Sequence, residues 1–527
     1  MTLASDAAQR RSQSVFLPAP LLGLNTVDAP GIMTPEYALQ LTNFLPLQNG
    51  LETRGGSLPW AVGLPGDVES VLPWTGGTGH LFAASGGAIY RLPETPDMQV
   101  EPIIQLDGFT SNWFQHVNFT NNGGTWLWAC NGEDAPAMYN GTEWQRAAIT
   151  GISGDKQPVH VAVYQNRLFF CVPGSLDMYY LETDAIQGAA SKLPLGAYFD
   201  RGGEILLLGN VTVDGGYGPD DYLIAVTSEG EIASFKGRNP DSASSGAMVG
   251  RFQIARPMGR RSAVKWAGDL VIMTEHGVAG ISGMLSNELA GLVQAATEKI
   301  QPTWAQLARN GYGRNGWDIC VYHRRGLMFL NIPTPYTGST QYVFNPTTVA
   351  WADVAGWEEA LCFVEYQGQL LAGMKGRVQL LDVFTNDVKP DGIDSFVGYP
   401  VMSRLNQAFV QPAGGGVKKQ YTLMRPYVSA SVQPQVNMGL NTDNIIKTFS
   451  FPRILSPVDD QEGMKWNEYE WNTSVWATSD NSWNLRTRWA TSNGVGYSVS
   501  VGLEVTANIT SATYTGCDLQ YIVSNAL

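Results

Sequence analysis

The chain has 527 residues, enough for two or three domains with sizeable cores, and its 44 % hydrophobic content excludes an intrinsically disordered protein. With 58 glycines, 29 prolines and only 15 % charged residues, the composition is typical of a turn-rich β protein with large contact surfaces. The net charge is −14, and residues 395–527 hold nine acidic and nine basic residues, so the whole excess lies in residues 1–394. This acidic body argues against binding DNA or an anionic membrane through a basic surface.

Residues 1–60 are expected to form an N-terminal arm and a platform segment. Residues 1–16 are polar and predict a mobile arm. Thr34 can cap a short helix with Pro35 at its first position, so we expect a helix over residues 34–44. Asn49-Gly50 then predicts a hairpin turn that leads into a strand and a Gly55-Gly56 break.

The body, residues 61–394, repeats a strand–turn–strand unit whose clearest copy is Trp266–Ile281. Its apolar run, Leu270–Met273, is too short for a helix, and Gly277 supplies the positive φ of a tight turn. The copies follow one another at spacings of 42 to 57 residues and are marked by Leu81, Trp126, Leu168, Leu223, Leu270, Leu327 and Leu370. This recurrence predicts a degenerate β-propeller with six or seven blades. The copies lack a Trp-Asp or kelch signature, and a large irregular β-sandwich stays open as the alternative.

A small helical insertion is predicted near residues 287–309. Apolar residues from Leu289 to Ile300 form one stripe of an amphipathic helix, and Pro302 ends it. A second short helix is expected over Thr303–Arg309. The insertion either caps the propeller or packs on a neighbouring subunit, with Leu289, Val293 and Trp304 as candidate interface residues.

Residues 395–527 predict a separate, Trp-rich β domain of sandwich-like type. Its strand Gly496–Val505 alternates apolar and polar residues, as expected for a strand with one buried face. Five tryptophans crowd one 24-residue window: Trp466, Trp471, Trp476, Trp483 and Trp489. They are either sandwich core or the centre of a subunit interface, where Trp is enriched.

Motifs for enzyme chemistry give little support for a catalytic protein. Gly311–Gly316 matches the dinucleotide fingerprint by letter, but it precedes a strand where the fingerprint needs a helix. The loop Gly414–Lys419 lacks the ending of a phosphate-binding loop, and no nucleophile elbow is present. The five histidines lack metal-ligand spacing. No catalytic, cofactor-binding or metal-binding residue is therefore assigned, and no cofactor is expected.

Carboxylates that meet only in space stay open as an alternative. Asp220, Asp221, Asp269 and Glu275 are candidates for glycoside hydrolysis, although turn residues and solvated charges fit them better. The loop Asp214–Asp221 could wrap calcium, but it lacks the spacing of a known calcium loop.

The cysteines and the termini bear on the compartment. Five widely spaced cysteines without a Cys-x-x-Cys pair predict buried free thiols in a reducing compartment. No apolar run is long enough to span a membrane. Arg10-Arg11 before an apolar segment is a weak export signal, because Pro18 and Pro20 interrupt that segment.

The N-terminal segment resembles the opening of the tail nozzle (tail hub) proteins of short-tailed bacteriophages. The resemblance rests on Gly23-Leu24-Asn25-Thr26, on the segment Pro35–Phe44, which includes Ala38 and Asn43, and on Gly50–Gly56, which includes Arg54. In that family a Gly-x-Asn turn, an "A…N" helix and a "G-x-x-x-R-x-G" stretch precede a degenerate propeller and a Trp-rich β region.

The resemblance implies a structural virion protein that is not an enzyme. Its expected form is a homohexameric ring below the portal and adaptor proteins, which docks tail fibres and lets DNA pass without specific binding. The expected location is the virion tail, after assembly in the host cytoplasm. The acidic body fits a channel wall that repels phosphate. The alternatives are a propeller enzyme or lectin acting on cell-surface glycans, and a secreted propeller scaffold.

Overall fold

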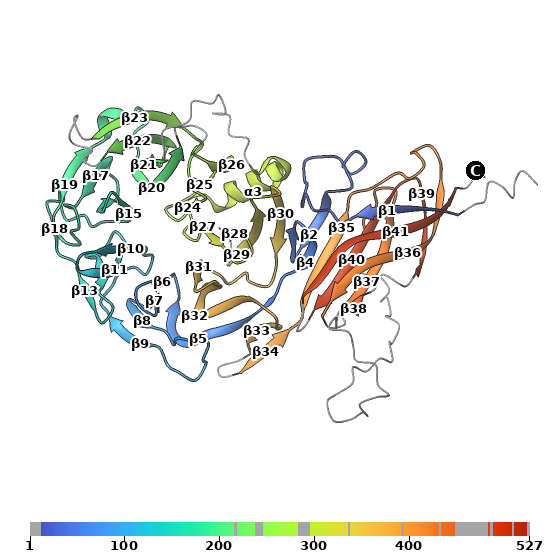
Figure 1. Ribbon diagram of the computed structural model, residues 1–527, viewed down its shortest axis with the longest axis horizontal. Helices are drawn as coiled ribbons and strands as arrows, with labels where there is room; N and C mark the ends of the chain where they lie inside the picture. Colours follow the sequence, from blue (N-terminus) through green and yellow to red (C-terminus); the bar gives the residue numbers. More distant parts are fainter. Residues whose placement is uncertain are drawn as a thin grey trace, which may run out of the picture. The chain divides into compact units, whose positions relative to one another are not determined.

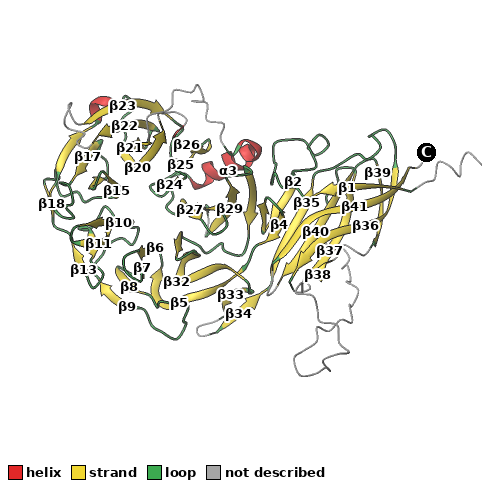
Figure 2. Ribbon diagram, in the orientation of Figure 1, coloured by secondary structure: helices red, strands yellow, loops and turns green. Residues whose placement is uncertain are grey.

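The computed structural model describes residues 12–523 except 215–218, 238–245, 283–295, 336–337, 392–394, 432–433, 448–482, 485–488 and 508–510. Nearly all regular structure in this part of the chain is β-strand (Figure 2). Within it, α3 (Gln301–Gly311) is the one α-helix, beside the short 3-10 turns η1 (Gly196–Tyr198) and η2 (Glu298–Ile300). The all-β class is therefore as expected.

The chain forms two compact units that interleave along the sequence. Unit 1 comprises residues 1–58, 343–356 and 382–527, and unit 2 comprises residues 59–342 and 357–381. This differs from three consecutive domains divided at residues 60 and 394. The N-terminal segment belongs with the C-terminal one because its strands pair there, as β4 does with β41.

Most sheets of unit 2 are antiparallel and are built from strands that follow one another along the chain, whereas one two-stranded sheet is parallel. These sheets stand side by side in a ring (Figure 1). The strands are β5 (Gly56–Asp67, beginning in unit 1), β6 (Ser70–Trp74), β7 (His80–Ser85), β8 (Ala88–Arg91), β9 (Ile103–Leu106), β10 (Gln115–Asn121), β11 (Gly124–Cys130), β12 (Ala137–Tyr139), β13 (Trp144–Arg146), β14 (Ile149–Thr150), β15 (His160–Tyr164), β16 (Arg167–Cys171), β17 (Asp177–Tyr180), β18 (Gly188–Ala189), β19 (Ser191–Pro194), β20 (Ile205–Asp214), β21 (Pro219–Thr227), β22 (Glu231–Gly237), β23 (Gly246–Gln253), β24 (Ala263–Trp266), β25 (Asp269–Thr274), β26 (Gly277–Gly280), β27 (Asp318–Tyr322), β28 (Leu327–Pro333), β29 (Ser339–Asn345, ending in unit 1), β31 (Cys362–Tyr366) and β32 (Gln369–Val383, ending in unit 1).

The hydrophobic cores of unit 2 lie between successive sheets. One cluster joins Phe82 of the first sheet to Leu127 and Tyr139 of the second. Further clusters join the second sheet to the third, the third to the fourth, and the fourth to the fifth. Sheets that pack face to face around a ring form a β-propeller, so the predicted fold of the body is confirmed.

The segment Trp266–Ile281 shows how the sequence specifies one blade. β24 and β25 meet at a turn formed by Ala267 (φ 49°) and Gly268 (φ 90°), and β25 pairs in turn with β26. Leu270–Met273 is buried on both faces because sheets lie on either side of it. The expected strand pair is therefore present.

Unit 1 is built from two groups of strands, in keeping with the expected sandwich-like domain. In one, β3 (Phe44–Leu47), β4 (Gly50–Thr53), β41 (Ala512–Val523), β36 (Lys419–Ala430) and β38 (Trp483–Asn484) form a sheet, joined by β1 (Gln13–Pro18) on β41 and β39 (Ala490–Gly496) on β36. In the other group, neighbouring strands pair in the order β30 (Ala350–Val354), β2 (Ala38–Thr42), β35 (Val401–Gln407), β40 (Val499–Ala507) and β37 (Gln435–Thr442). β33 (Asp387–Pro390) and β34 (Phe396–Tyr399) pair as a further hairpin.

The helix expected over residues 34–44 is wrong. A turn occupies residues 35 and 36, and β2 (Ala38–Thr42) pairs antiparallel with β35. Ala38 and Leu41 are fully buried in this position, so tertiary pairing overrides the local capping signal.

The helical insertion is described only in part. Residues 283–295, which include Leu289 and Val293, lie outside the described residues. The second predicted helix, Thr303–Arg309, is confirmed as the middle of α3.

Candidate functional site

A cavity of about 530 Å³ occupies the centre of unit 2. Most of its lining comes from strands that are each the edge strand of their sheet: β6, β10, β15, β20, β24, β27 and β31; Leu270 of β25 also lines it. These strands lie on the inner side of the ring (Figure 1).

A second cavity of about 720 Å³ adjoins the first. It is lined by loops that lead into the inner strands, among them 110–113, 257–261 and 312–317. Gln115, Arg260 and Arg261 line both cavities, so the two meet at these side chains. Ligand sites favour such concave surfaces with convergent polar groups.

Arg261 spans the junction between the cavities. From the loop before β24, its guanidinium donates to the Glu69 carbonyl at 2.7 Å, to the Ser70 hydroxyl, and to the Phe114 carbonyl at 2.9 Å. Its Cζ also lies 4.5 Å from the centre of the Trp113 ring. Arg261 therefore ties the fifth sheet to the entries of the first and second.

Arg260 contacts a different sheet from those that Arg261 contacts. Its Nη2 forms an ion pair with Glu204 at 2.8 Å, and its Nη1 donates to the Leu206 carbonyl at 2.9 Å. The adjacent arginines thus hold loops that lead into three other sheets. Neither arginine is among the residues predicted from the sequence, although two consecutive arginines before a strand in an acidic body are a recognisable signal.

Burial disfavours the charged forms of the two histidines and of Asp318 in the central cavity. Burial, aided by Arg261, lowers the pKa of His116 to about 4. Burial and Arg260 lower the pKa of His160 to about 3, and its Nδ1 accepts a hydrogen bond from the Leu208 amide. Burial raises the pKa of Asp318 to about 6, although Arg261 and the Phe363 amide oppose this shift.

Three of the four carboxylates considered for glycoside hydrolysis, Asp220, Asp221 and Asp269, make contacts that stabilise local structure. Asp220 forms an ion pair with Lys236 at 2.6 Å, and Asp221 accepts from the Thr212 hydroxyl. Asp269 Oδ1 accepts from three backbone amides at the two ends of its hairpin. None of the four, Glu275 included, lines either cavity.

The structure also shows where the other sequence motifs considered for chemistry lie. Gly311–Gly316 follows a helix and precedes β27, the reverse of the dinucleotide arrangement. Lys419 in the glycine-rich loop is buried and donates to the Tyr497 carbonyl at 2.8 Å. The loop Asp214–Asp221 includes residues 215–218, which lie outside the described part. Over the described residues, no group of three or more His, Cys, Asp or Glu side chains is placed to hold a metal ion.

All five cysteines are free and buried, as expected. Burial raises the pKa of the Cys171 and Cys362 thiols to about 12, which disfavours the reactive thiolate. No helix in the described part of the chain is both long and apolar enough to cross a bilayer.

The interface candidates from the sequence have different environments. Trp304 is fully buried in unit 2, and its indole N–H donates to the Thr274 carbonyl. The backbone of Trp483 pairs with Ala430, whereas Trp489 is 37 % exposed. The remaining candidates, Trp466, Trp471, Trp476, Leu289 and Val293, lie outside the described residues.

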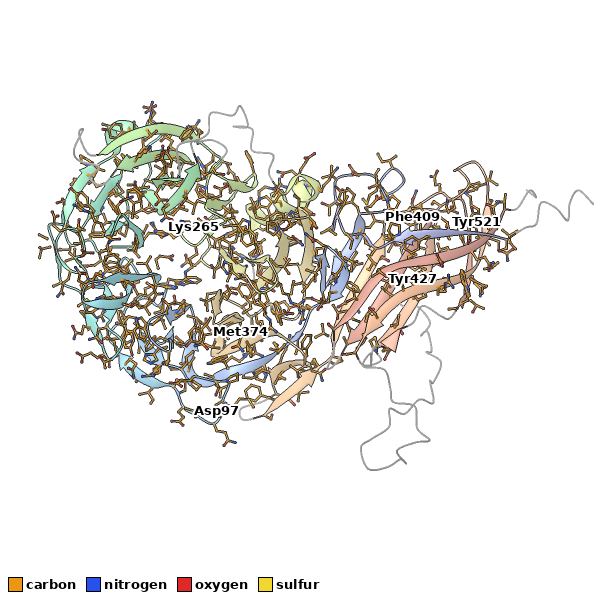
Figure 3. The ribbon with its side chains drawn as sticks, in the orientation of Figure 1. Asp97, Lys265, Met374, Phe409, Tyr427 and Tyr521 are labelled. Carbon is orange, nitrogen blue, oxygen red and sulfur yellow. The ribbon has the colours of Figure 1, made fainter. Side chains whose placement is uncertain are left out.

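Trp489 belongs to an exposed aromatic patch on unit 1, which we define as Phe16, Arg425, Tyr427 and Trp489. The Arg425 guanidinium lies 4.7 Å from the Trp489 ring centre and 5.6 Å from that of Tyr427. Phe16, 53 % exposed, contacts Tyr427 edge to face, and Asp518 holds Arg425 and Tyr427 by hydrogen bonds. Figure 3 labels Tyr427 on this sheet.

The residues that carry the family resemblance form a buried network in unit 1. Arg54 pairs with Asp387 and donates from Nε to Asn43 Oδ1 at 2.9 Å. A side chain on Gly55 or Gly56 would collide with the backbone of residues 382–386, so this close approach requires glycine. Gly23 passes the Trp351 backbone just as closely.

Comparisons with known proteins give no family. No family model matches the chain, and no curated protein matches it. Among solved structures it is similar to YCF48 bound to D1 peptide (11 % identity, 68 % of this chain, 99 % of that chain, TM-score 0.35). It is also similar to BBS1N in complex with ARL6DN (12 % identity, 62 % of this chain, 97 % of that chain, TM-score 0.37). A third similar structure is Saccharomyces cerevisiae Sqt1 (10 % identity, 70 % of this chain, 95 % of that chain, TM-score 0.35). These weak likenesses carry no information on function.

Proposed function

We propose that this chain is a non-enzymatic structural protein, the subunit of a phage tail nozzle that assembles as a homohexameric ring. The observation that carries the proposal is the buried network of Asn43, Arg54 and Asp387 in unit 1. Two of these residues belong to the motifs of the resemblance, and the network gives those motifs a shared structural purpose. Charged groups buried at this depth are costly unless they are paired and hydrogen-bonded, as Arg54 and Asp387 are.

The aromatic patch of unit 1 supports self-association. Tyr, Trp and Arg are the residue types that dominate binding energy at protein interfaces, and here they contact one another on an exposed sheet face. Residues 395–527 have balanced charge, so copies can approach through this region without the repulsion expected from the acidic body. A ring requires two complementary surfaces on each copy that close by rotation.

The central cavity of unit 2 bears on where DNA would pass. Arg261 crosses it with bonds to three residues, so a duplex cannot thread the axis of one propeller. We therefore place the proposed DNA channel between the copies of a ring. Portal or adaptor proteins above the ring and tail fibres around it are the partners that this role implies, and the virion tail is the location.

The test is the size and symmetry of the purified protein. Analytical ultracentrifugation and negative-stain electron microscopy at micromolar concentration should give rings of six copies. A species that stays monomeric at tens of micromolar, alone and with portal or adaptor protein, would contradict the proposal. Release of sugar from host polysaccharide would contradict it independently and would favour a glycan-active propeller.

A further inference from the structure

The central cavity of unit 2 differs in charge from the protein around it. The chain carries a net charge of −14, yet three cationic side chains line this cavity against one carboxylate. The cations are Arg260, Arg261 and Lys265, and the carboxylate is Asp318. A cavity with one sign of charge and low-dielectric walls concentrates ions of the opposite sign.

Several polar groups in the cavity have no protein partner. Within the described residues, the side chains of Gln115 and His116 on β10 and of Lys265 on β24 make no hydrogen bond or ion pair. Lys265 is exposed and lies on the inner side of the ring (Figure 3). Uncommitted donors that converge on a cavity characterise a ligand site.

The backbone adds donors to this set. β6, β10, β15, β20, β24, β27 and β31 are each the edge strand of their sheet, so one edge of each has no strand partner. Such an edge presents a row of N–H and C=O groups. Backbone N–H groups that converge on a concavity bind anions in many proteins.

The size of the space limits the occupant. About 530 Å³ is within the range of small-molecule sites. Arg261 divides this space from the second cavity and is fixed by the Glu69 carbonyl, the Ser70 hydroxyl and the Phe114 carbonyl. The volume and the fixed Arg261 side chain therefore favour a small molecule as the occupant.

We propose that the central cavity of unit 2 binds a small multivalent oxyanion, phosphate-bearing or polycarboxylate. Lys265 supplies the direct counter-charge, while the Gln115 amide and the His116 ring N–H donate to the anion oxygens. Arg261 acts through its field, because its own donors hold the neighbouring loops, whereas the charge of Arg260 is paired with Glu204. This site is separate from the interface proposed on unit 1.

Isothermal titration calorimetry on the full-length protein tests the site, with inorganic phosphate, citrate and glucose as separate probes. We expect phosphate or citrate to bind with one site per chain and glucose not to bind. The stronger of the two anions identifies the phosphate or the polycarboxylate class. If neither phosphate nor citrate binds at 10 mM, the proposal is overturned, whether or not glucose binds.

Two variants locate the binding. Lys265→Gln and His116→Gln should each weaken anion binding about tenfold or more, because each removes a direct contact. Lys375→Gln is the matched control, since Lys375 is an exposed lysine of unit 2 outside both cavities. Unchanged affinity in the Lys265→Gln variant, with a wild-type melting temperature, means that the anion binds elsewhere and overturns the proposal.

Discussion

Arg54 and Asp387, 333 residues apart in the sequence, form a two-pronged ion pair inside unit 1. Nη2 lies 2.6 Å from Oδ2, Nη1 lies 3.0 Å from Oδ1, and the side chains are 1 % and 6 % exposed. Arg54 also donates to the Ala355 carbonyl, so one side chain joins all three segments of unit 1. The planar guanidinium suits this geometry, which an ammonium group cannot reproduce.

Replacement of Arg54 should destabilise unit 1 strongly. Arg54→Met leaves Asp387 buried without its partner and should lower the free energy of unfolding by about 3–5 kcal/mol. Arg54→Lys keeps the positive charge but should still lose a large part of this stabilising free energy. Hydrogen exchange of the β36 and β41 amides measures the effect in unit 1 itself.

A double-mutant cycle separates the pair from simple packing loss. Asp387→Asn combined with Arg54→Met should cost clearly less than the sum of the single changes. Arg404→Met, which removes a more exposed ion pair with Glu504, is the control and should cost about 1 kcal/mol or less. Additive effects would mean that the pair is not coupled as described.

Arg261 should be more important to unit 2 than any surface arginine. Arg261→Met leaves the Glu69 and Phe114 carbonyls without their donor, and we expect a loss of about 2–4 kcal/mol in the unfolding of unit 2. Arg201→Met, at an exposed position, should change stability by less than about 0.5 kcal/mol. Equal melting temperatures for the two variants would show that the junction does not hold the ring.

Removing the Asp318 charge should stabilise the protein at neutral pH. Burial raises the pKa of Asp318 from 3.8 to about 6, so the folded protein holds this proton more tightly than the unfolded chain does. The resulting stabilisation is complete below pH 3.8 and is lost as the pH rises through about 6. Asp318→Asn keeps an acceptor for the Phe363 amide and should raise the melting temperature at pH 7.5 but not at pH 3.5. A lower melting temperature at pH 7.5 would contradict this account.

The cavity histidines should make unit 2 sensitive to acid. Their pKa values fall to about 4 (His116) and about 3 (His160), below the ordinary 6.5, so the unfolded chain takes up protons first. Stability from these groups is present above pH 6.5 and declines as the pH falls toward 4. His116→Gln should reduce that decline relative to the wild type, with Asp318 intact in both proteins. Thermal melts at pH 7 and pH 4.5 provide the comparison.

The aromatic patch should control self-association. If the proposed ring forms through unit 1, Trp489→Ala and Tyr427→Ala should each weaken assembly by about tenfold or more, as removal of interface hot spots does. Tyr399→Ala changes a 49 % exposed tyrosine of unit 1 outside the patch and should leave assembly unchanged. Sedimentation velocity over a concentration series measures all three. Rings that persist in both patch variants would place the interface elsewhere.

The sequence predicts the fold of unit 2 well because each blade is local. Leu270–Met273 and the turn at Gly277 specify a strand pair from neighbouring residues alone. The helix over residues 34–44 is wrong because β2 is determined by its partner β35, more than 350 residues away. Local patterns cannot report a partner at that distance.

The central cavity of unit 2 could not be predicted from local sequence patterns. His116, His160, Arg261 and Asp318 belong to four different sheets or loops, and only closure of the ring brings them to one cavity. The carboxylates selected from turns, such as Asp269, instead hold the ends of their own hairpins. Spacing along the chain identifies turns, whereas the cavity is defined by equivalent positions in successive blades.

The interleaving of the two units has a consequence for synthesis. Residues 59–342 and 357–381 of unit 2 leave the ribosome before residues 382–527 of unit 1, because they precede those residues in the chain. Arg54 must wait for Asp387, and β1 and β4 must wait for β41, before their sheet can close. Contacts of such long range form late. A chain that ends before residue 425 would therefore lack Arg425, Tyr427 and Trp489 of the aromatic patch and, under the proposed function, could not join the ring.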